Sequence, residues 1–231
     1  MGELSIEAKQ NVYLRYRSYP YKWPQVFAEF IDNAIQSFED NKDLLRVEDP
    51  NYKLRVDIVF DWESSAEDGE KKAKSVTISD NAGGMPEERF KIALNLADDS
   101  MMRSGMNEFG IGMKAAAAWL GNNWHIETKS LTDDKTLVVD VDITDVCKRD
   151  LRRLPYKETI EPARKNGTSI TLSDFGKRGF YLSRMSRLSL RIFQVSIAVF
   201  FVKKKSYFMS KIRSSPLTNI QFWLPHPIRN F

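Results

Sequence analysis

The sequence has few of the residues that build metal centres and disulfide bonds. Its 231 residues include one cysteine, Cys147, and two histidines, His125 and His226. A single cysteine excludes an internal disulfide, and so few ligands leave little for a zinc site or a cysteine–histidine nucleophile pair. The N-terminus also lacks a basic segment followed by an apolar run and a cleavage site, so we expect a reducing, cytoplasmic setting.

Long hydrophobic runs are missing as well. The longest, residues 192–202, spans 11 residues and is interrupted by Gln194 and Ser196. A membrane-spanning helix needs about 20 apolar residues, so we expect no membrane partner. Hydrophobic residues make up 42% of the chain and charged residues 29%, which is the balance of a folded globular protein.

Acidic residues are absent from one end of the chain. Residues 176–231 carry 11 Lys and Arg and no Asp or Glu, whereas residues 1–175 carry 24 basic and 31 acidic residues. This change predicts a main domain over residues 1–175 and a basic tail over residues 176–231. Three interpretations of the tail are open: the end of a truncated or out-of-frame longer protein, a helix packed on the body, or an arm for nucleic acid that uses Lys203, Lys204, Lys205, Lys211 and Arg213.

Hydrophobic periodicity predicts an α+β fold. The apolar residues of segment 26–38 recur at helical spacing, and this helix is expected to run from Pro24 to about Asn41. Further helices are expected over 86–96 and 113–121, and strands over 54–60, 75–79, 124–131, 136–143 and 168–175. Residues 144–165 are expected to be irregular, and residues 1–22 to form a strap across the body or to meet a partner. The order predicts a two-layer sandwich, with helices on one face of a mixed, mostly antiparallel sheet.

The first helix carries a polar pair that could take part in chemistry. Glu29 and Asn33 are four residues apart, so their side chains lie about one turn apart on the same helix face. A carboxylate and an amide in this arrangement can hold a water molecule and a metal ion, with one group as base and the other as ligand. The alternative is a polar face that is merely solvated.

Three further stretches are candidates for ligand binding. Asp80 ends a predicted strand just before Gly83 and Gly84, where a carboxylate could accept a hydrogen bond from an amine while a flat ring approaches the backbone. Residues 109–114, FGIGMK, lead into a predicted helix whose N-terminus could cradle phosphate. Thr168 could reach a ligand with its hydroxyl. Each has an ordinary structural alternative: a turn, a flexible loop and a packed strand threonine.

In combination, these motifs resemble the GHKL ATPase superfamily, whose ATP-binding domain has the Bergerat fold. The resemblance covers roughly residues 10–175 and is most similar to MORC-like and heat-shock-chaperone-type ATPases. Four motifs occur in the family's order: Glu29 to Asn33, Asp80 to Gly84 followed by Met85, the glycine-rich lid segment Gly105 to Lys114, and Gly167-Thr168.

The resemblance implies a role for each matching residue. Glu29 is expected to be the general base that orients the attacking water, and Asn33 to hold magnesium against the triphosphate. Asp80 is expected to bind the adenine amine. The remaining residues are expected to complete the ATP site: Gly84 and Met85 at the base, Gly110, Gly112 and Lys114 around the phosphates, Thr168 beside Asp80, and Asn95 as a further nucleotide contact.

The function that this resemblance implies is magnesium-dependent ATP binding with slow hydrolysis, which closes a lid and changes association with a partner, including a second copy of the chain. Glu29 favours hydrolysis, because histidine kinases typically lack a carboxylate four residues before the asparagine. Two features depart from the family: Ala82 replaces a glycine, and residues after Phe175 leave no room for a transducer domain. The alternative is therefore a non-hydrolysing regulatory module, a kinase-type ATP domain, or a fragment of a longer ATPase.

Overall fold

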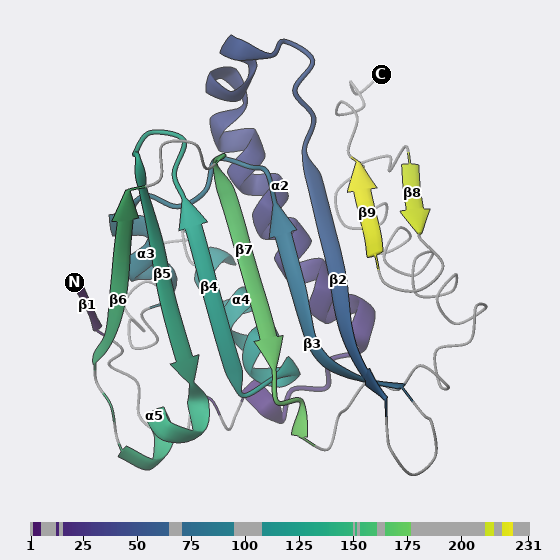
Figure 1. Cartoon of the computed structure of the whole chain (residues 1–231), viewed down its shortest axis with the longest axis vertical. Coiled ribbons are helices and arrows are strands. Elements are labelled where there is room, and N and C mark those ends of the chain that lie inside the picture. The colour runs from purple at the N-terminus through teal and green to yellow at the C-terminus, as the bar shows by residue number, and fades with distance from the viewer. Residues whose placement is uncertain are drawn as a thin grey trace.

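One antiparallel sheet forms the body of the protein (Figure 1). The computed structural model describes residues 2–5, 13, 16–64, 71–94, 108–149, 151, 153–160, 165–176, 211–214 and 219–223. The strand order is β1-β6-β5-β4-β7-β3-β2-β9-β8, and every pairing between these strands is antiparallel. Their bounds are β1 Gly2–Ser5, β2 Arg55–Ser64, β3 Lys71–Asp80, β4 Asn123–Lys129, β5 Lys135–Asp142, β6 Arg153–Ile160, β7 Gly167–Ser173, β8 Lys211–Ser214 and β9 Asn219–Trp223.

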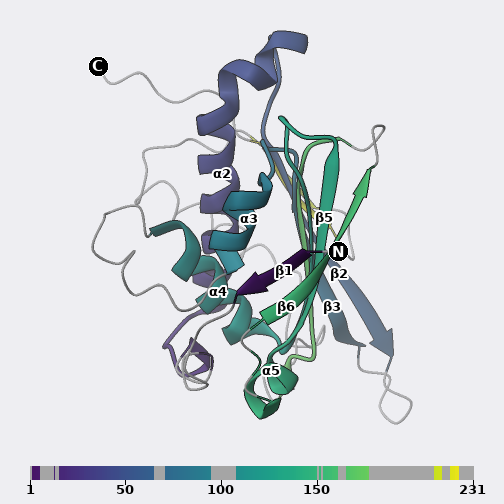
Figure 2. The ribbon, with the colours of Figure 1, turned by 90° about the vertical axis from the view of Figure 1, so that its left-hand side faces the viewer.

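Three helices cover one face of this sheet, which confirms the predicted α+β two-layer architecture (Figure 2). These are α2 (Trp23–Glu48), α3 (Glu87–Leu94) and α4 (Glu108–Leu120), whereas α5 (Ile143–Arg149) links β5 to β6 at one end of the sheet. No helix in the described part of the chain is both long and apolar enough to cross a membrane.

Helix α2 begins and packs as its sequence predicts. Pro24 lies in the first turn, and the Lys22 N–H donates to Gln25 Oε1 over 2.8 Å, which satisfies a donor at the helix start. The predicted apolar stripe is buried along its whole length, with Phe27 and Ile31 fully inaccessible. The helix continues past Asn41 to Glu48, and its last turns bury Leu45. Burial of one apolar face fixes which polar face is left for function.

The sheet register places one apolar row against the helices. Ile58 pairs with Ile78, Ile78 with Ile170, Ile170 with Ile126, and Ile126 with Val139, so the row crosses five strands. All five side chains are at most 6% exposed. Because a shift by one residue would move every such side chain to the open face, this row specifies the register that brings Asp80 beside β7.

The prediction that residues 144–165 are irregular was wrong. They include helix α5 and strand β6, which buries Leu154 and Tyr156 while its other side chains are largely exposed. Tyr156 packs edge-on against Phe90 of α3, and its hydroxyl lies 2.6 Å from Glu87 Oε1. Only two buried positions hold this strand, so its charged composition concealed it.

Segments at both ends of the chain pack on the body. Tyr13 and Tyr16 are buried, and the Trp119 indole N–H of α4 donates to the Tyr19 carbonyl over 3.0 Å. The strap over residues 1–22 stays a prediction. In the tail, β9 pairs with β2, and β8 pairs with β9. The domain boundary near Phe175 and the origin of the tail stay predictions.

Candidate functional site

Glu29, from the predicted motif on the first helix, contacts Gly112 of the predicted lid motif. Glu29 lies on the polar face of α2, and α2 packs against α4. A Cβ atom on Gly112 of α4 would overlap Glu29 Oε2 and lie 3.2 Å from its Cδ. Glycine at this position therefore makes room for the carboxylate, and Glu29 is held directly against the helix that carries the predicted phosphate-binding residues.

Helix α4 starts earlier than predicted. Its first residue is Glu108, so Gly110 and Gly112 lie inside the first turns of the helix rather than before it. The N–H groups at the start of the helix still have no partner within the helix and carry the positive end of its dipole. Lys114 lies further along the helix and is 5% exposed, and burial lowers its pKa from 10.5 to about 8. The predicted phosphate-binding residues thus lie on α4, the helix whose Gly112 contacts Glu29.

Asn33 and Tyr21 complete the surroundings of Glu29. Asn33 is partly exposed on α2, one turn beyond Glu29, so an amide oxygen and a carboxylate share one face. Tyr21 precedes the helix and packs edge-on against Trp119. Burial raises the pKa of Tyr21 to about 12, and the negative charge of Glu29 adds to the rise. Sequence reasoning missed Tyr21 as a neighbour, because its position depends on how the strap packs on α4.

Asp80 is an oriented hydrogen-bond acceptor at the end of β3. Its carboxylate accepts the Ala82 N–H at 2.9 Å and the backbone N–H of Thr168. Burial raises the pKa of Asp80 from 3.8 to about 6, while these two hydrogen bonds act in the opposite direction. An ionised carboxylate has about four lone-pair positions, so acceptor capacity is left for a ligand.

The loop after Asp80 is fastened to β4. Gly84 has φ +65°, and a Cβ there would overlap the Lys129 carbonyl, so this position needs glycine. The Leu131 N–H donates to the Gly83 carbonyl over 2.8 Å. Ala82, which replaces a family glycine, is fully buried and has no positive φ, so alanine fits its backbone conformation. The loop thus holds Met85 next to β4.

Two residues that sequence reasoning missed tie this loop to β7. The Met85 N–H donates to Thr128 Oγ1 over 2.9 Å, and Thr128 Oγ1 lies 3.0 Å from Thr168 Oγ1. Asn166 Nδ2 donates to the Ala82 carbonyl over 2.5 Å. A sequence signal for Thr128 exists, since it follows Trp124 and Ile126 on the core-facing side of β4 and is a polar residue in an apolar row.

The structure therefore brings predicted residues together in two groups. Glu29 and Gly112 are in contact, with Asn33 and Lys114 on the same two helices. Asp80, Met85 and Thr168 are connected through backbone hydrogen bonds and Thr128, with Gly84 in the same loop. Asn95 lies outside the described residues, as do residues 105–107 of the lid segment.

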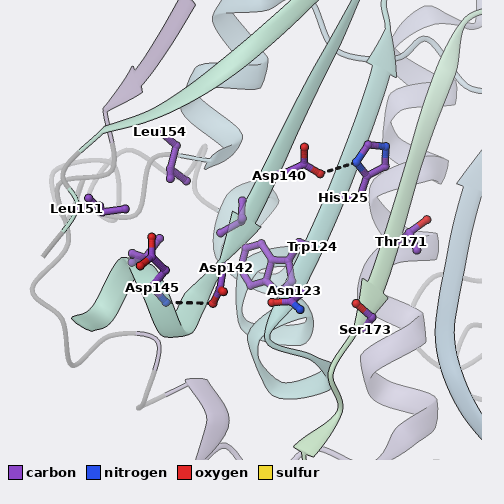
Figure 3. Close-up of a pocket in the computed structure, with 12 residues that line it drawn as sticks. Asn123, Trp124, His125, Asp140, Asp142, Asp145, Leu151, Leu154, Thr171 and Ser173 are labelled. Atoms are coloured by element: carbon purple, nitrogen blue, oxygen red, sulfur yellow. Dashed lines mark hydrogen bonds and ion pairs between the residues drawn. The ribbon is translucent and has the colours of Figure 1, made fainter. Parts of the chain in front are cut away.

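A pocket of about 480 Å³ lies elsewhere, next to α5 (Figure 3). Its acidic side chains have local partners: Asp140 contacts His125 Nδ1 at 2.7 Å, Asp142 accepts the Asp145 N–H at 3.0 Å, and Asp145 pairs with Arg149 at 3.1 Å. None of the predicted site residues that the structure describes lines this pocket. Residues Thr171 and Ser173 place it at the far end of β7 from Thr168.

Comparison with known protein families agrees with this geometry. Residues 21–177, more than half of the chain, match the family described as histidine kinase-, DNA gyrase B-, and HSP90-like ATPases. The matched range runs from the start of α2 to just past β7 and contains every element that contributes to the two groups of residues. A comparison with curated proteins found no match. The closer resemblance to MORC-like proteins stays a prediction.

Proposed function

Because the chain belongs to the family of histidine kinase-, DNA gyrase B- and HSP90-like ATPases, whose domain binds ATP, we propose that it hydrolyses ATP slowly with magnesium at the site formed by α2, α4, β7 and the loop after β3. The observation that supports hydrolysis is the contact between Glu29 and Gly112. It holds a carboxylate against the helix on which the phosphates are proposed to bind.

The base of the nucleotide fits the Asp80 side of this site. The Asp80 carboxylate already accepts two backbone N–H groups, which fix its orientation and leave lone pairs for the exocyclic amine of adenine. Gly84 keeps the loop close to β4 without a side chain in the way, and Met85 is partly buried against the core. A planar apolar ring could pack on such a surface while its polar edge reaches Asp80.

The phosphates fit the α4 side. The first turns of a helix offer N–H donors and a positive dipole end, and Gly110 and Gly112 keep side chains out of the approach. Lys114 adds a cation whose charged form is disfavoured by burial, so a nearby phosphate would stabilise the charge that burial opposes.

The donor chemistry of α2 suits magnesium shared with a triphosphate. Magnesium in such sites takes one or two protein oxygens, and its other ligands are phosphate oxygens and water. Asn33 offers an amide oxygen on the face that also carries Glu29, so Asn33 would hold the ion. When bound, magnesium neutralises negative charge on the phosphate oxygens.

Glu29 would act on the attacking water. Its carboxylate accepts a proton as the water oxygen bonds to the terminal phosphorus, and the bond from that phosphorus to the bridging oxygen breaks, releasing ADP and phosphate. Closure of the lid, association of two copies and nucleic-acid binding by the tail are further predictions from the sequence. Of the lid segment, residues 105–107 lie outside the described residues.

Replacement of Glu29 tests this proposal. Glu29→Ala should bind ATP with nearly unchanged affinity but release phosphate at least roughly 100-fold more slowly, because the proton acceptor is lost. A matched control is Glu39→Ala on the same helix, since Glu39 forms a partly exposed ion pair with Lys42 at 3.2 Å. Equal phosphate release from wild type and Glu29→Ala would refute the assignment. Binding without release in the wild type would favour the non-hydrolysing alternative.

A further inference from the structure

Thr128 occupies an unusual position for a polar side chain. It lies in the middle of the sheet on the core-facing side of β4 and is completely buried. Its hydroxyl contacts three groups from two other segments: the Met85 N–H at 2.9 Å, the Gly167 carbonyl at 3.3 Å and the Thr168 hydroxyl at 3.0 Å. Thr128 therefore joins the Asp80 loop to the start of β7 through a single atom.

The hydrogen-bonding capacity of this hydroxyl determines the direction of each bond. A threonine hydroxyl donates once and accepts twice. The Met85 N–H can only donate and the Gly167 carbonyl can only accept, so Thr128 accepts from the first and donates to the second. Its remaining lone pair then accepts from the Thr168 hydroxyl. This assignment satisfies all three partners of a buried group, which is the arrangement that burial favours.

The consequence concerns Thr168, which is partly exposed beside Asp80. Once its hydroxyl hydrogen is engaged by Thr128, Thr168 presents only lone pairs to a ligand. Asp80 likewise presents only lone pairs when ionised. The two side chains form an acceptor pair, which suits the amine of adenine and opposes the carbonyl oxygen that guanine carries at the same ring position.

We propose that Thr128 is a positioning residue that keeps Thr168 an acceptor, and that it thereby makes the site select ATP over GTP. This inference rests on the proposed nucleotide site and adds to it the origin of base selectivity. Without the Thr128 hydroxyl, Thr168 is free to rotate and donate to a guanine carbonyl, so the penalty against GTP falls. Met85 also loses its anchor to β4.

Two substitutions at Thr128 test the proposal. Thr128→Val keeps the shape but removes the hydroxyl, whereas Thr128→Ser keeps the hydroxyl. Dissociation constants for ATP and GTP should show that Thr128→Val lowers the preference for ATP over GTP roughly tenfold. The reason is that the Thr168 hydroxyl can then donate one hydrogen bond to guanine instead of to Thr128. Thr128→Ser should keep the wild-type preference.

Thr136→Val is the matched control. Thr136 lies on the adjacent strand β5, is 1% exposed, and its hydroxyl has no hydrogen-bond partner among the described residues. This variant should therefore keep the wild-type preference for ATP. Equal loss in Thr136→Val and Thr128→Val would show that any buried threonine matters, and it would overturn the proposal. Equal loss in Thr128→Ser and Thr128→Val would overturn it as well.

Hydrogen exchange in the wild-type chain provides a test that does not depend on whether a variant folds. The Met85 amide lies in a loop, yet its bond to Thr128 predicts that it exchanges slowly without nucleotide. Rapid exchange would refute the anchor.

A wild-type chain that binds neither nucleotide would refute the proposed function together with the selectivity. A chain that binds ATP, with Thr128→Val keeping its preference, would refute only the role of Thr128.

Discussion

Gly112→Ala should separate folding from catalysis in this protein. Gly112 lies within α4 and has no positive φ, so alanine fits the backbone. Among the described residues, the nearest conflict is with the end of the Glu29 side chain, because the new Cβ would overlap Oε2. The substitution therefore acts on the proposed base without removing any group from it.

The stability effect of this substitution should be small. Replacing glycine by alanine inside a helix gains about 1 kcal/mol. Rotating the Glu29 carboxylate out of the way opposes this by about 0.5–1.5 kcal/mol, the cost of an off-rotamer side chain. The free energy of unfolding should thus change by less than about 1 kcal/mol.

The effect on hydrolysis should be large. The carboxylate must retreat by about 1 Å before its contact with the new methyl group becomes an ordinary van der Waals contact. A displacement of this size in a catalytic group lowers rates roughly 100-fold. ATP affinity should change less than about threefold, since the Asp80 side of the site is untouched.

Urea unfolding, ATP binding and phosphate release on the same preparation would measure these three effects. Glu29→Gln and the double variant Gly112→Ala/Glu29→Gln complete the comparison. If Gly112→Ala acts through Glu29, the double variant should release phosphate no more slowly than Glu29→Gln alone. Phosphate release by Gly112→Ala at the wild-type rate would refute the reasoning, as would additive losses in the double variant.

Three further predictions concern charge and backbone conformation. Burial raises the pKa of Asp80 from 3.8 to about 6, so the contribution of Asp80 to the free energy of unfolding should fall as pH rises from 3.8 to 6. ATP affinity should fall as pH drops below about 6, because the carboxylate becomes protonated. Asp80→Asn should remove both pH trends from the unfolding and binding curves. Burial lowers the pKa of Lys114 from 10.5 to about 8, so the free energy of unfolding should rise as pH increases through this range. Lys114→Met should abolish that rise and stabilise the chain at neutral pH while weakening ATP binding. The same pH dependence of the free energy of unfolding in Lys114→Met and the wild type would contradict this. Gly84→Ala should lower the free energy of unfolding by more than about 3 kcal/mol through its clash with the Lys129 carbonyl, against about 1 kcal/mol for Gly176→Ala, which has φ +54° and open space; similar losses in urea unfolding would contradict the clash.

Local patterns predicted much of this site. The stripe of α2 fixed the orientation of Glu29 and Asn33, because an amphipathic helix buries one face whatever it packs against. Asp80 and Thr168 could be placed at strand ends from alternation alone. Ala82 stands where the family has glycine, and alanine fits there because the position is buried and has no positive φ.

Other features depended on contacts between distant segments. Glycine disfavours helices, so α4 was expected to begin after Gly112, yet it begins at Glu108 and packs on α2. Strand β6 was missed because only two of its side chains are buried. A polar residue in the apolar row of β4 marks Thr128 in the sequence, but its contacts with Met85 and Thr168 depend on how the loop after β3 and strand β7 pack against β4.

The central claim is that separate segments of this chain form one ATP site in which Asp80 binds the base. The most direct test is equilibrium binding of ATP with magnesium to the wild type, Asp80→Ala and His125→Ala, where His125 belongs to the pocket beside α5. The site predicts that Asp80→Ala weakens binding at least roughly 30-fold, the loss of a charge-assisted hydrogen bond, and that His125→Ala binds as the wild type does. Equal affinity of Asp80→Ala and the wild type would contradict this account.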